Sequence, residues 1–79
     1  LSEDDFVTAA DGKPMGKRTY FALWRQYYFG LQGESKGISL GQMVSMGKKI
    51  LRRDTRGFGA ACLDLTVIVM RKKGIEMPD

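Results

Sequence analysis

The chain has 79 residues, of which 43% are hydrophobic, and a net charge of +4. This length fits one small domain, and the hydrophobic fraction is typical of a globular rather than a disordered protein. There is no histidine, and Cys62 is the single cysteine, so an internal disulfide is excluded and neither a zinc site nor a histidine-based catalytic site is expected. We therefore expect no enzyme activity, no metal and no cofactor.

The charges are divided unevenly along the chain. Residues 1–12 hold four acidic side chains and no basic one, whereas residues 13–79 hold thirteen basic and five acidic side chains, so the two parts carry −4 and +8. We interpret residues 1–12 as an acidic N-terminal arm and residues 13–79 as a single small basic domain. The arm is either a solvated terminus or a segment that folds back on the basic domain. The sequence Asp-Gly-Lys-Pro at residues 11–14 predicts a turn where the acidic arm meets the basic domain.

The first predicted helix covers residues 17–31. On a helical projection, nearly all of its large apolar and aromatic side chains fall in one sector about 160° wide. Phe29 lies outside this sector, and Arg18 and Arg25 lie on the opposite face. Gly30 supplies a stop signal, because glycine commonly ends helices.

The second predicted helix covers residues 40–53. Ser39 precedes Gln42 by three positions, which is the spacing of a capping box. Gly47 lies on the apolar face of this helix, where it would allow the close approach of a large side chain such as Trp24. The opposite face carries four basic side chains, Lys48, Lys49, Arg52 and Arg53.

The segment from residue 62 to residue 70 is ambiguous between strand and helix. Its apolar residues alternate with Asp64 and Thr66, and four β-branched residues run together, which favours a strand. A strand needs a neighbour, either residues 6–8 or another chain. The competing interpretation is a buried helix over residues 58–70. We therefore predict an α+β fold with two amphipathic helices and a C-terminal strand, and keep an all-α three-helix bundle as the alternative.

Aromatic side chains form the first candidate binding surface. Six of the eight aromatic residues lie between Tyr20 and Phe29. The simpler interpretation is that these rings form the core. However, a domain of this size does not need so wide an aromatic face, and tyrosine and tryptophan are enriched where partners bury a surface. We expect Trp24, Tyr28 and Phe29 to form an interface with a protein partner.

Basic side chains form the second candidate surface, which consists of Lys48, Lys49, Arg52, Arg53 and Arg56. These cations are suited to contact the phosphates of a nucleic acid. The alternative is a solvated face that favours the negative end of the helix dipole. No zinc-finger, homeodomain or RNA-binding signature is present, so any such binding would be sequence-nonspecific. The Gly57–Gly59 pair follows a helix and lacks a lysine-serine or lysine-threonine ending, so no nucleotide-binding loop is expected there.

The sequence thus favours a non-catalytic protein-interaction module, or a small subunit of a larger assembly, that docks through the aromatic helix face. A sequence-nonspecific nucleic-acid-binding protein is the alternative. The longest apolar run, residues 65–70, is too short to span a membrane. The sequence leaves self-association open and indicates no compartment.

Overall fold

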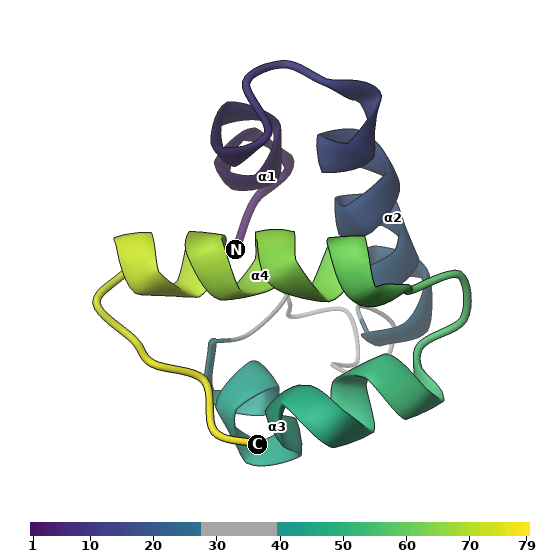
Figure 1. Ribbon diagram of the computed structural model, residues 1–79, viewed down its shortest axis with the longest axis vertical. Helices are drawn as coiled ribbons and strands as arrows, with labels where there is room; N and C mark the ends of the chain where they lie inside the picture. Colours follow the sequence, from purple (N-terminus) through teal and green to yellow (C-terminus); the bar gives the residue numbers. More distant parts are fainter. Residues whose placement is uncertain (28–39) are drawn as a thin grey trace.

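The computed structural model describes residues 1–27 and 40–79, which form four α-helices. Their bounds are α1 (Glu3–Ala9), α2 (Pro14–Tyr27), α3 (Leu40–Asp54) and α4 (Ala60–Lys72). Helix α4 lies in the middle of the molecule and packs against the other three (Figure 1). In that view α1 lies above α4, α3 lies below it and α2 runs down the right-hand side, so α4 separates α1 from α3.

The predicted α+β fold is wrong, because the described residues form no strand. Residues 62–70, the predicted strand, lie inside α4. The buried side chains of α4 recur at intervals of three and four residues, which is the period of a helix; they are Cys62, Leu65, Thr66, Val69 and Met70. Burial of this stripe outweighs the modest strand preference of the β-branched residues. The all-α alternative fits better, with four helices in the described part rather than three.

The two predicted amphipathic helices are present with somewhat different bounds. Helix α2 begins at Pro14, because the fixed backbone angle of proline suits the first turn of a helix. Of the predicted span 17–31, residues 28–31 lie outside the described residues. Helix α3 covers the predicted span and one further residue. The predicted capping box also lies partly outside the described residues, because it includes Ser39.

The acidic N-terminal segment contains α1, a helix that we did not predict. Its capping box pairs Ser2 with Asp5: the Ser2 hydroxyl accepts from the Asp5 N–H at 3.4 Å, and the Asp5 carboxylate accepts from the Ser2 N–H at 2.9 Å. Phe6 is completely buried, and the Asp5 carboxylate lies 3.1 Å from the ammonium group of Lys73. A buried ring and an ion pair therefore hold α1 against the basic part of the chain.

The connection between α1 and α2 is the predicted turn. Asp11 and Gly12 both have positive φ, 54° and 76°, a conformation that asparagine, aspartate and glycine tolerate best. Beyond the turn the two helices approach closely at Gly16, where an added Cβ would lie 2.7 Å from the carbonyl oxygen of Phe6. Glycine at this position lets the two backbones touch.

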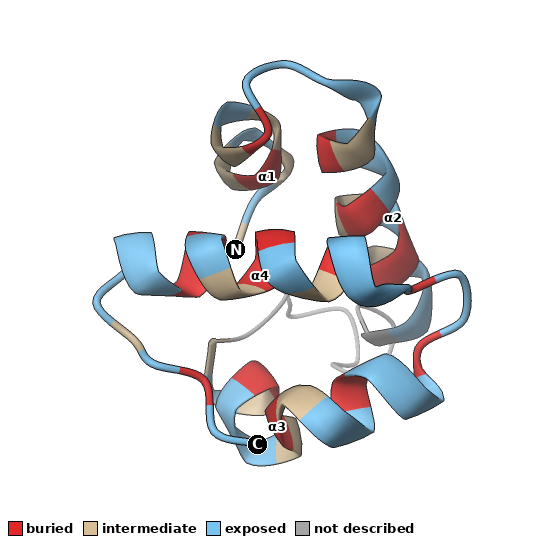
Figure 2. Ribbon diagram, in the orientation of Figure 1, coloured by how far each residue is buried: buried red, intermediate tan, exposed pale blue. Residues whose placement is uncertain are grey.

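The core fills the space between α4 and its neighbours, where the buried residues gather (Figure 2). Each helix contributes at least one completely buried side chain, and the largest are Phe6, Leu23, Met43, Leu51, Val69 and Met70. Burial of one such aliphatic or aromatic side chain stabilises a fold by about 1.5–3 kcal/mol. The connection from α3 to α4 is anchored in the same way, because Phe58 is buried.

The segment after α4 returns to α3. Helix α4 ends in a Schellman motif, in which the N–H of Ile75 donates to the Met70 carbonyl at 3.0 Å and the N–H of Gly74, at φ 84°, donates to the Arg71 carbonyl at 2.9 Å. Met77 is then buried, and the chain ends beside α3 (Figure 1).

The C-terminal segment contacts α3 at Gly47, where the helix is interrupted. Gly47 has φ 76° and ψ 169°, a combination open almost only to glycine. The N–H of the next residue, Lys48, donates to the Pro78 carbonyl at 2.7 Å. The atoms nearest to an added Cβ at Gly47 belong to the backbone of Pro78 and Asp79. The close approach that we expected from Trp24 is therefore made by the C-terminal segment.

Candidate functional site

The aromatic side chains of α2 are divided between the core and the surface. Trp24 is half-buried and packs against the core. Phe21 is 45% exposed, and its ring meets that of Trp24 edge to face with 6.4 Å between the centroids. Tyr28 and Phe29 lie outside the described residues. Among the α2 side chains described up to residue 26, Phe21 is thus the exposed aromatic ring.

The predicted basic residues of α3 fall into two groups. Lys49, Arg52 and Arg53 are exposed and share one face of the helix, because they are separated by three and four positions. Lys48, four positions before Arg52, is half-buried, and its ammonium group is 3.3 Å from the Asp79 carboxylate. The structure therefore brings the four cations together along α3 and pairs one of them, Lys48, with the C-terminal segment.

Arg53 also has an acidic neighbour. Its Nε lies 2.8 Å from the carboxylate of Asp54, and this hydrogen-bonded pair raises the pKa of Arg53 and lowers the pKa of Asp54. Both side chains are exposed, so the pair contributes little to stability. Its effect is to reduce the net positive charge at that point of the helix.

Gln26, which we did not single out from the sequence, joins the end of α2 to the end of α3. Its side-chain amide Nε2 donates to the carbonyl of Asp54. Its Oε1 accepts from the backbone N–H of Arg56 at 3.1 Å. One side chain thus satisfies a carbonyl at the C-terminus of α3 and fixes the backbone that carries Arg56.

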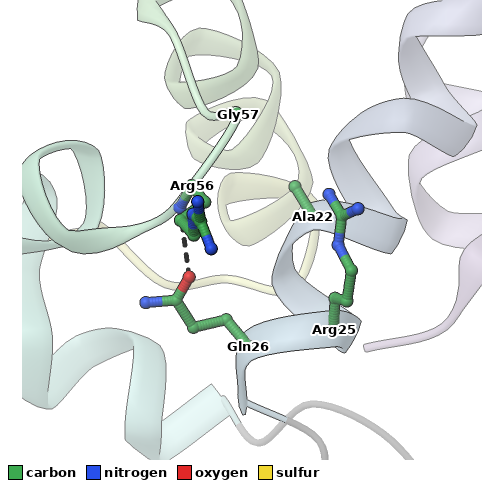
Figure 3. A pocket seen from close by; sticks show the side chains of 5 residues that line it. All are labelled: Ala22, Arg25, Gln26, Arg56 and Gly57. Carbon is green, nitrogen blue, oxygen red and sulfur yellow. Dashed lines mark hydrogen bonds between the residues drawn. The ribbon is translucent and has the colours of Figure 1, made fainter.

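A cavity of about 520 Å³ lies beside this clamp, and we call it the arginine pocket. It is lined by Ala22, Arg25, Gln26, Arg56 and Gly57. Arg25 stands on one side of it, from α2, and Arg56 on the other, from the turn after α3 (Figure 3). No acidic side chain is among the described residues that line it.

A second, more open cavity of about 620 Å³ runs along α3. Its lining combines the cations Lys48, Lys49, Arg52 and Arg53 with Leu63, Asp64 and Asp79. The two carboxylates offset part of the positive charge there. Of these two cavities, the arginine pocket is the one whose described lining residues include no acid.

The arginine pocket could not be recognised from local sequence. Arg25 and Gln26 lie on the polar face of the predicted helix, and Arg56 lies thirty positions after Gln26. Only the packing of α2 and α3 around α4 brings these residues together. The sole sequence signal was the basic cluster that ends with Arg56.

The described residues show neither a metal site nor a membrane span. Within residues 1–27 and 40–79, no three His, Cys, Asp or Glu side chains lie close enough together to hold a metal ion. No helix in the same part of the chain has the length and apolar character needed to cross a membrane.

Comparisons with protein-family models, with curated proteins and with solved structures gave no match to this chain.

Proposed function

We propose that this protein binds nucleic acid without sequence preference, through a basic surface made of Arg25, Lys49, Arg52, Arg53 and Arg56. The observation that supports the proposal is the gathering of cations at two cavities. Arg25 and Arg56 line one of them, and Lys49, Arg52 and Arg53 line the other. The sequence alone favoured a protein-interaction module. We prefer nucleic-acid binding, because most of the described aromatic rings are buried or pack against the core.

The charge of the basic surface is available to a ligand. Arg25, Lys49, Arg52 and Arg56 form no ion pair with any described residue. Binding of such cations to phosphates releases the counterions that surround a nucleic acid, and this release drives nonspecific binding. The surface presents no motif that reads base edges, which is why we propose binding to the backbone.

The test is the affinity for a short fluorescent DNA duplex, measured by anisotropy across a salt series. If the basic surface contacts about four phosphates, the logarithm of the binding constant should fall with the logarithm of salt concentration with a slope near −3.6. The double variant Lys49→Glu/Arg52→Glu should bind more weakly, and its slope should be shallower by about two.

A matched control separates this surface from net charge. Lys13, immediately before α2, and Lys17, within it, are exposed, and Lys13→Glu/Lys17→Glu changes the total charge by the same amount. The control should bind nearly as well as the unaltered protein. Equal loss of affinity in both double variants, or binding that does not respond to salt, would contradict the proposal.

Phe21 supports protein interaction as a second candidate function. A phenylalanine ring that is 45% exposed and rests on Trp24 is a suitable anchor for a partner, or for a second copy of this chain. Sedimentation velocity of the unaltered protein and of Phe21→Ser tests this candidate. Self-association that disappears in Phe21→Ser would favour it. A monomer in both cases would leave a different protein as the partner, to be sought by capture that requires Phe21.

A further inference from the structure

We infer that the arginine pocket is a binding site for a single phosphate group, held by the guanidinium groups of Arg25 and Arg56. This inference rests on the proposed function, in which the phosphate belongs to a nucleic-acid backbone. It goes further by naming one site within the basic surface and the chemical group that occupies it.

The chemistry of the lining suits a phosphate. A guanidinium group is a planar donor that matches phosphate oxygens in pairs, and it keeps its charge at every physiological pH. Two such groups come from different elements and stand on opposite sides of one cavity (Figure 3). A cavity of about 520 Å³ is also large enough to admit a phosphate together with part of the chain that carries it.

The pocket is built before any ligand arrives. Gln26 uses both its oxygen and its nitrogen to join the end of α2 to the turn that carries Arg56. Gly57 has φ 71°, and among the described residues an added Cβ there would meet the Arg25 guanidinium at 4.0 Å. The turn that carries Arg56 is thus held in place beside Arg25. Such preorganisation reduces the entropy that binding must overcome.

The neighbouring cavity on α3 is a weaker candidate for the same ligand. It holds more cations, but Asp64 and Asp79 share its lining and Lys48 is already paired. An incoming phosphate would be repelled by these carboxylates, whereas the arginine pocket has no lining acid in the described residues.

The experiment titrates inorganic phosphate into the full chain and follows backbone amides by NMR, with chloride at matched ionic strength as reference. We expect saturable shifts at residues 22–26 and 56–57. Arg25→Gln and Arg56→Gln should each weaken phosphate binding by about tenfold, because each removes a charged hydrogen-bonding group. Arg18→Gln, the same change at an exposed position on α2, should leave it unchanged.

Arg25→Lys distinguishes a shaped site from simple charge. Lysine keeps the charge but lacks the paired donors, so this variant should bind phosphate more weakly than the unaltered protein. Equal binding by Arg25→Lys, no saturation in the unaltered protein, or equal loss in Arg18→Gln would overturn the inference. None of these results depends on DNA, so the proposed function can survive the failure of the pocket.

The same variants then identify the source of the phosphate. If Arg25→Gln and Arg56→Gln lose affinity for both phosphate and the DNA duplex, the pocket receives a backbone phosphate. If they lose phosphate binding but keep full DNA affinity, the nucleic-acid backbone is excluded as the ligand of this pocket. If the unaltered protein binds phosphate but no DNA, the proposed function fails and the pocket serves free phosphate.

Discussion

Two buried threonines differ in whether their hydroxyl groups are satisfied. Thr19 and Thr66 are both completely buried. The Thr66 hydroxyl donates to the Cys62 carbonyl at 2.9 Å, whereas the Thr19 hydroxyl has no hydrogen-bond partner among the described residues. A buried polar group without a partner is destabilising, and a satisfied one contributes modestly to stability.

Replacement of each threonine by valine should therefore have opposite effects. Valine keeps the shape and the β-branch, so the hydroxyl is the main change. Thr19→Val should raise the free energy of unfolding by about 1 kcal/mol, and Thr66→Val should lower it by about the same amount. Urea denaturation followed by circular dichroism measures both. A fall in stability in Thr19→Val would show that its hydroxyl has a partner.

At the scale of helices, two glycines occupy opposite situations. Gly47 has a backbone conformation suited to glycine and touches the C-terminal segment. Gly59 is the N-cap of α4, has extended backbone, and has open space around an added Cβ. Its lack of a side chain leaves the first N–H groups of α4 without a side-chain cap.

Substitutions at these two positions should change the free energy of unfolding in opposite directions. Gly47→Ala should lower the free energy of unfolding by about 1–3 kcal/mol through backbone strain, in addition to displacing residues 78–79. Gly59→Ser should raise it by a few tenths of a kcal/mol, because serine caps helices slightly better than glycine. Thermal denaturation of both variants tests the pair, and a neutral Gly47→Ala would contradict the described break in α3.

The capping box of α1 makes that helix sensitive to acid. Burial raises the pKa of Asp5, but the hydrogen bonds from Ser2 and the pairing with Lys73 outweigh it and lower the pKa below the ordinary 3.8. A carboxylate with a lowered pKa stabilises the folded state above the ordinary pKa, and this contribution is lost as pH falls through the folded-state pKa.

The stability difference between the unaltered protein and Asp5→Asn should thus be largest near neutral pH and shrink as pH falls below 3.8. Asp4→Asn is the control, because Asp4 lies exposed in the same turn. The stability difference between the unaltered protein and Asp4→Asn should be smaller at every pH. Chemical denaturation at several pH values gives these differences, and a constant Asp5→Asn difference would count against the capping role of Asp5.

At the scale of the whole molecule, the sequence predicted those helices whose local signals agreed with their packing. Helices α2 and α3 have long amphipathic stripes, and both were expected. Helix α1 was missed although Ser2 and Asp5 have capping-box spacing ahead of Phe6, because the acidic charge of that segment was given more weight. In α4 the β-branched run favours a strand locally, whereas the helical spacing of Cys62, Leu65 and Val69 matches the face that packing buries.

The candidate site was predicted only in part, for a different reason. The basic cluster is contiguous in sequence, so its cations could be named in advance. The contribution of Arg25 depends on the hydrogen bonds that Gln26 makes to residues 54 and 56. Such a contact between distant positions follows from how α2 and α3 are placed around α4, which no local pattern contains.

The placement of α1 and α3 on opposite sides of α4 separates the acidic segment from the cations of α3. Four acidic residues lie within residues 1–12 at one end, and the cations of α3 lie at the other (Figure 1). Near a nucleic acid, the negative end is repelled while the positive end is attracted, so the molecule rotates before contact and more collisions begin on the basic surface. Under the proposed function, the acidic segment would reduce the total attraction to a nucleic acid and favour association through the basic surface.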